Sequence, residues 1–132
     1  MAGSFTTAEA NIILTAKFKT LTNYLALFTA SPADAGAVAN EVPNAADYVR
    51  KVNIFGDDAA LRAIANTGDI TFVPANGGDW GTVTHVGFSS SITWQDPIYA
   101  WGPLTTSMLI EDGDQIKFVT GNITITFAAG TE

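Results

Sequence analysis

The sequence predicts a mainly β protein, a β-sandwich or jelly roll with one N-terminal amphipathic helix. One helix-start signal lies near the N-terminus, and roughly seven or eight short strand-like runs follow it at spacings of about eight to twelve residues. Hydrophobic residues make up 47% of the 132-residue chain and charged residues only 14%, which is enough apolar material to bury one core. We therefore expect an N-terminal helical arm over residues 1–22 and a single β-sandwich domain over residues 23–132.

The helix is predicted over residues 7–20. Thr6-Thr7-Ala8-Glu9 matches the capping box, in which the threonine hydroxyl accepts a hydrogen bond from the glutamate amide. Ile13, Leu14 and Phe18 then recur at helical spacing and form an apolar stripe. Because an isolated helix of this length is marginal in water, we expect the stripe to dock on the sandwich or on a neighbouring subunit. Ile13 and Phe18 are therefore candidate interface residues.

The rest of the chain predicts strands, loops and turns. Residues 24–30 form an apolar run typical of a strand covered on both faces, and residues 31–47 read as a long loop. Residues 48–55 indicate a half-buried strand with Tyr48, Val52 and Ile54 on one face. Residues 57–65 are expected to form a connection with at most one or two helical turns. Further strands are expected at residues 69–72, 82–88, 98–101, 107–110, 115–119 and 122–127, with a break at Gly102-Pro103 between the third and fourth of these.

Charge and apolar run length exclude several partners. The chain has 6 Lys and Arg against 13 Asp and Glu, a formal net charge of -7, which would repel nucleic acid and anionic membrane surfaces. Its apolar runs are too short for a membrane span, and the N-terminus lacks the features of a signal peptide. We expect a soluble protein made in the cytosol, with neither nucleic acid nor membrane as a partner.

The residues that could support catalysis or metal binding are few. With no cysteine and one histidine, His85, the chain offers no thiolate site and no nucleophile paired with a base, so His85 is expected to be structural or on the surface. The carboxylates lie beside glycine or proline, as turns require, and no calcium-loop spacing is present. We expect no catalytic residue, no metal and no cofactor.

The order of several motifs resembles a small β-domain family of tailed bacteriophages, usually labelled phage tail fibre or virion structural protein. The segments that carry the resemblance are, in chain order, Tyr24-Leu25-Ala26-Leu27-Phe28-Thr29, Pro32-Ala33-Asp34-Ala35-Gly36, Glu41-Val42, Tyr48-Val49-Arg50, Ile70-Thr71-Phe72, Trp80-Gly81-Thr82-Val83-Thr84-His85, Tyr99-Ala100-Trp101-Gly102-Pro103-Leu104-Thr105, Gly113-Asp114 and Ile123-Thr124-Ile125-Thr126. The resemblance covers residues 24–127, except that residues 89–97 replace an expected aspartate-glycine hairpin turn.

Two features of the resembling region suggest contacts. Glu41 and Arg50 are a candidate structural pair, in which a guanidinium fork would fix the long loop, although both could instead be solvated. Ile92 and Trp94 lie on the loop that departs from the family and are candidate interface residues. The alternative for Trp94 is that it packs back on its own domain.

The resemblance implies a non-enzymatic bacteriophage virion structural protein. We expect a capsid decoration (cement) protein that stabilises the shell, or alternatively a tail-fibre or baseplate component that contacts the host surface or its glycans. Expected partners are other virion proteins, either the major capsid protein or tail components, and further copies of the chain in a homotrimer. The expected location is the virion, assembled in the cytoplasm of the bacterial host.

Overall fold

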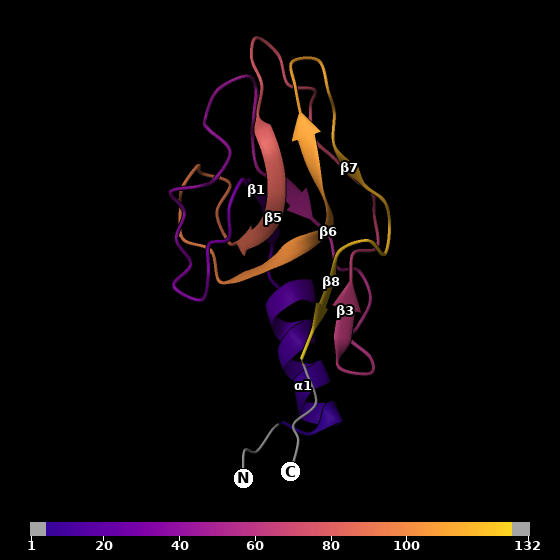
Figure 1. The fold of residues 1–132 in the computed structure, drawn as a ribbon. Coiled ribbons are helices and arrows are strands. Elements are labelled where there is room, and N and C mark those ends of the chain that lie inside the picture. Colours follow the sequence, from indigo (N-terminus) through magenta and orange to yellow (C-terminus); the bar gives the residue numbers. More distant parts are fainter. Residues whose placement is uncertain (1–4, 128–132) are drawn as a thin grey trace. The chain divides into compact units, whose positions relative to one another are not determined.

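The fold is mainly β, with antiparallel sheets and one N-terminal helix, as the sequence predicts (Figure 1). It is seen in a computed structural model that describes residues 5–127. The helical elements are α1 (Thr7–Leu14) and a π-helical continuation, η1 (Thr15–Lys19). The strands are β1 (Asn23–Phe28), β2 (Lys51–Asn53), β3 (Ala63–Ala65), β4 (Ile70–Thr71), β5 (Gly81–Ser89), β6 (Ala100–Ile110), β7 (Lys117–Phe118) and β8 (Thr124–Thr126).

The described chain forms two compact units. The first unit contains residues 5–22, 53–69 and 118–127, and the second contains residues 23–52 and 70–117. The first unit therefore joins the helix to two segments that the sequence assigns to the β-domain. The separation of residues 1–22 as an arm stays a prediction.

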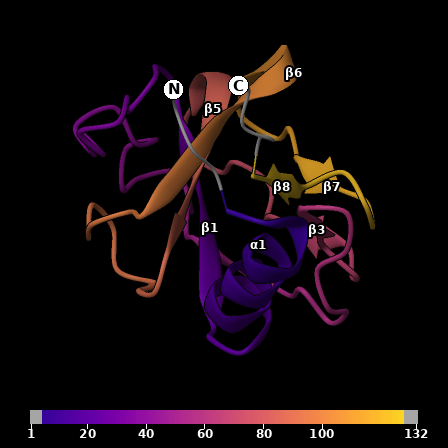
Figure 2. The same ribbon diagram turned by 90° about the horizontal axis from the view of Figure 1, so that it is seen from below.

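The first unit is organised around the helix. The Thr6 hydroxyl accepts a hydrogen bond from the Glu9 amide at 3.2 Å, as the capping box predicts. Ala10, Leu14 and Phe18 are buried along one side, and the Phe18 and Phe55 rings pack edge to face with their centroids 5.4 Å apart. β3 and β8 pair with each other and lie beside α1 (Figures 1 and 2).

The second unit contains most of a four-stranded sheet with the order β2-β1-β5-β6. In the antiparallel β1–β5 pair, Leu25 lies opposite Phe88 and Leu27 lies opposite Val86. Gly87 of β5 faces the Phe28 ring so closely that a Cβ atom would lie 2.7 Å from it. Glycine at this position lets the ring pack directly on the strand.

β6 is one long strand, so the predicted break at Gly102-Pro103 is wrong. Along β5 the pairing advances from Val83 to His85, while on β6 the partner moves from Met108 to Pro103. β6 therefore contains an irregularity in the pairing that absorbs the extra residues, and pairing with β5 continues through Gly102 and Pro103.

The predicted strand over residues 48–55 is also only partly correct. β2 covers three residues, and Val52 and Ile54, predicted to share a face with the buried Tyr48, are 48% and 57% exposed. Tyr48 and Arg50 are buried before the strand, and Asn53, its last residue, and Phe55 beyond it are buried as well. The alternation changes phase between Arg50 and Asn53, and two of the four buried positions hold the polar residues Arg50 and Asn53, which a hydrophobic pattern does not select.

Replacing Gly87 with alanine should destabilise the protein. The added methyl group would collide with the Phe28 ring, and overpacking of this kind costs roughly 1–3 kcal/mol. Gly102→Ala is the matched control, because nothing lies within 4 Å of the Cβ position on that neighbouring strand. Urea unfolding of both variants measures the difference, and equal free energies of unfolding would show that β5 does not need glycine there.

Candidate interaction site

A buried ion pair joins the long loop to the segment before β2. The Arg50 guanidinium grips the Glu41 carboxylate with two parallel hydrogen bonds, Nε to Oε2 at 2.9 Å and Nη2 to Oε1 at 2.8 Å. Both side chains are 0% exposed. These two residues are the candidate pair predicted from the sequence, and the structure places them in direct contact.

Two further donors complete the surroundings of the Glu41 carboxylate. The Tyr48 hydroxyl donates to Oε2 at 2.7 Å and accepts from the Leu27 amide of β1 at 3.0 Å. The Gln95 amide donates to Oε1 at 2.9 Å. A buried carboxylate with four donors avoids the large penalty of an unpaired charge.

The same contacts shift the ionisation of the two partners. Burial raises the pKa of the Tyr48 phenol well above its ordinary value, and the neighbouring Glu41 charge and hydrogen bond raise it further. Burial alone would lower the Arg50 pKa, but the hydrogen bonds and charge of Glu41 hold it above its ordinary value. Tyr48 therefore acts as a neutral hydroxyl donor and Arg50 as a permanent cation.

The ion pair also fixes the loop between β5 and β6. Arg50 Nη1 donates to the Ser91 carbonyl at 3.1 Å, and Nη2 donates to the Asp96 carbonyl at 2.8 Å. The Ser91 hydroxyl lies 2.6 Å from an Asp96 carboxylate oxygen and so ties the two ends of the loop together. Gln95, whose amide reaches Glu41, has a φ of 61°, which L-residues rarely adopt.

This loop and the segment before β2 carry exposed apolar side chains. Val49, Ile92 and Trp94 are 46%, 51% and 36% exposed, and we call them the Trp94 patch. They line a groove of about 240 Å³ together with Asn44, Tyr48, Arg50 and Thr93. The Trp94 indole NH donates to the Val42 carbonyl at 2.9 Å, so one edge of the ring is bound to its own unit. The patch is thus a fixed apolar surface above a buried ionic centre.

The other candidate residues lie elsewhere. Phe18 is buried within the first unit, and Ile13 is half-buried. His85 on β5 is half-buried, with its Nδ1 atom 2.7 Å from the Thr84 hydroxyl and its ring centroid 5.8 Å from that of Trp101. Ile13 and Phe18 belong to the first unit and His85 to the second.

Sequence reasoning missed the donors around Glu41. The sequence pattern assigns Tyr48 only to one face of a strand, and nothing in the sequence marks the backbone amide of Gln95 as a partner. The order Glu41, Tyr48, Arg50 is the one signal that was present, since a carboxylate, a hydroxyl and a guanidinium occur close together in an otherwise weakly charged segment.

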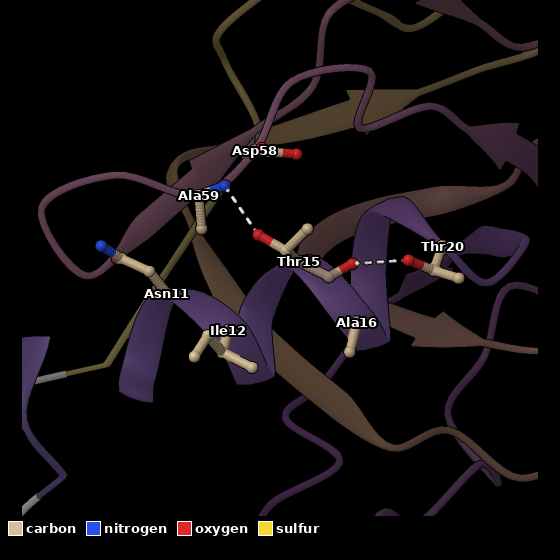
Figure 3. Close-up of a pocket in the computed structure, with 7 residues that line it drawn as sticks. All are labelled: Asn11, Ile12, Thr15, Ala16, Thr20, Asp58 and Ala59. Carbon is tan, nitrogen blue, oxygen red and sulfur yellow. Dashed lines mark hydrogen bonds between the residues drawn. The ribbon is translucent and has the colours of Figure 1, made fainter. Parts of the chain in front are cut away.

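A second hollow lies in the first unit (Figure 3). It has a volume of about 420 Å³ and is lined by Asn11, Ile12, Thr15, Ala16, Thr20, Asp58 and Ala59. The Thr15 hydroxyl accepts from the Ala59 amide at 3.0 Å, as the dashed line in Figure 3 shows. This contact fixes one side of the hollow against the π-helical turn.

Within residues 5–127, no three histidine, aspartate or glutamate residues gather in a way that could hold a metal ion. None of the helices in this part of the chain has the length and hydropathy needed to cross a membrane.

The sequence was compared with known protein families. Residues 6–126 match the family described as podophage GP4 fiber I protein gp80. The chain belongs to this family. The matched family is a phage fibre family, so the match confirms the resemblance to a tail-fibre or virion structural family of tailed phages. No curated protein matches the chain.

Replacing Arg50 with methionine should destabilise the protein strongly. The substitution leaves the Glu41 carboxylate buried without its cation, which typically costs about 3–5 kcal/mol. Lys51→Met, one residue along, removes a charge that is only half-buried and should change the free energy of unfolding by much less. The double variant Glu41→Gln with Arg50→Met should recover part of the loss in urea unfolding, and equal losses for Arg50→Met and Lys51→Met would contradict the role assigned to the pair.

Proposed function

We propose that this protein is a non-enzymatic structural subunit of a phage fibre. The family match over residues 6–126 carries the proposal. The carboxylates in the turns support it, because they accept backbone hydrogen bonds that stabilise the fold: Asp79 from the Asp112 amide, Asp112 from Gly77 and Asp69 from Thr120. Side chains used in this way stabilise turns and are poorly placed for acid–base chemistry.

The subunit works through contacts with other virion proteins and with further copies of itself, which we propose to form a homotrimer. The Trp94 patch supports a role in contact, since Ile92 and Trp94 are exposed on a loop whose backbone carbonyls are bound by the buried Arg50. We assign this patch to binding a tail component or the host surface. Capsid decoration, the role that the sequence first indicated, is the competing assignment.

Phage particles that lack the protein should lose adsorption to host cells and keep their heat stability. A fibre subunit is needed for attachment, whereas a cement protein holds the shell together against the pressure of the genome. Adsorption counts and the temperature of genome release, measured on complete and deleted particles, separate the two roles. Normal adsorption with genome release at a lower temperature would move the assignment to capsid decoration.

Restoring the deletion with variants then tests the patch. Trp94→Ala should assemble into particles yet weaken the contact by about 2 kcal/mol, the usual cost of losing an aromatic anchor. Leu109→Ala, which also removes an exposed apolar side chain from the second unit, serves as the control. Equal adsorption of particles that carry either variant would show that the patch is not the contact.

A further inference from the structure

The first unit contains a tight turn whose backbone conformation is unfavourable for its residues. Ala60 and Ala63 exchange two backbone hydrogen bonds, each 3.0 Å long, around Leu61 and Arg62. Leu61 and Arg62 have φ values of 52° and 65°, a region that suits glycine and asparagine in two-residue turns. The Leu61 side chain is 88% exposed. The chain thus holds a large apolar side chain in water on a strained turn.

The surrounding structure enforces this conformation. The Arg62 amide donates to the Asn11 side chain at 2.9 Å, and its guanidinium donates to the Phe127 carbonyl at 3.0 Å and to the Phe5 carbonyl at 2.7 Å. The Phe127 amide in turn donates to the Arg62 carbonyl at 2.9 Å. Strain that is held by several independent contacts is characteristic of functional positions.

A recess that suits such a side chain lies close by in the same unit. The hollow of Figure 3 is lined on its apolar part by Ile12, Ala16 and Ala59, and Ile12 is 61% exposed. Ala59 is two residues from Leu61, and Asn11, which also lines the hollow, binds the turn. A projecting side chain and a hollow on one surface make that surface complementary to a second copy of itself.

The distribution of charge favours the first unit over the second as the surface through which two copies meet. The described residues of the first unit carry a net charge of -1, from Lys17, Lys19 and Arg62 against Glu9, Asp57, Asp58 and Asp69. The second unit carries -5, from Arg50, Lys51 and Lys117 against Asp34, Glu41, Asp47, Asp79, Asp96, Glu111, Asp112 and Asp114. Two copies that meet through their first units therefore avoid the like-charge repulsion that the second units would cause.

We propose that the first unit carries a self-association surface, in which Leu61 of one copy seats in the hollow lined by Ile12, Ala16 and Ala59 of another. The inference rests on the proposed homo-oligomeric structural role and names its contact. Association of this kind is apolar and takes place between acidic chains, so added salt screens the remaining repulsion and strengthens it.

Sedimentation equilibrium of the full chain tests the proposal with the variant Leu61→Asn. Asparagine tolerates the left-handed conformation, so this variant should fold at least as stably as the original while removing the apolar side chain. The dissociation constant for self-association should rise about 30-fold. Leu109→Asn, which changes a leucine 57% exposed on β6 of the second unit, is the matched control and should leave the constant unchanged.

A substitution that fills the hollow provides a second, independent test. Ala16→Phe places a ring where Leu61 of the other copy should enter, and it should weaken association as Leu61→Asn does, with the melting temperature as a check on folding. Either a dimer or a trimer would support the proposed self-association surface. A dimer would contradict the homotrimer proposed above.

Three results would contradict the proposed self-association surface. They are a monomeric unsubstituted chain, equal changes in the dissociation constant for Leu61→Asn and Leu109→Asn, and association that weakens as salt is added. If Leu61→Asn instead blocks incorporation into particles without changing the mass in solution, the occupant is another virion protein. A chain that self-associates through Leu61 but is absent from phage fibres would support the self-association surface and contradict the proposed function.

Discussion

The buried pair of Glu41 and Arg50 is the constraint on which the second unit depends. Removing two charges from water costs several kcal/mol for each ion, so the pair is tolerable only if both groups are fully hydrogen-bonded. The partners that achieve this come from two further segments, residues 48–50 and the 89–97 loop, which meet the Glu41 loop. These segments must therefore close around the carboxylate together, or the charges remain unpaired.

This constraint links the interior to the surface. The Arg50 guanidinium binds two carbonyl groups of the 89–97 loop, and that loop carries Ile92 and Trp94 on its exposed side. A loop that is already ordered loses little conformational entropy when a partner binds it. The turn at Leu61 shows the same arrangement in the first unit, where Arg62 donates a hydrogen bond to Asn11 and accepts one from Phe127, and the Leu61 side chain stays exposed. Both units thus present apolar groups on backbones fixed by polar contacts.

The sequence predicts those parts of the fold that local patterns determine. The Thr6 cap, the helix, β1 and β5 follow from capping chemistry and apolar runs, and the structure has them where expected. It does not predict β3 or the continuous β6, because these depend on long-range pairing and on an irregularity in that pairing that no local pattern encodes. At the candidate site, charge types suggest Glu41 and Arg50, but the Gln95 amide and the burial of Tyr48 arise only once the loops have closed.

Amide hydrogen exchange of the 89–97 loop tests the central claim most directly. If the ion pair locks the loop, the Gln95 amide, which donates to Glu41, should exchange about as slowly as the Leu27 amide of β1, so that both open only when the second unit unfolds. Exchange at Gln95 that is orders of magnitude faster than at Leu27, with β1 and β5 still protected, would show that the loop opens independently of the buried pair and would contradict the account.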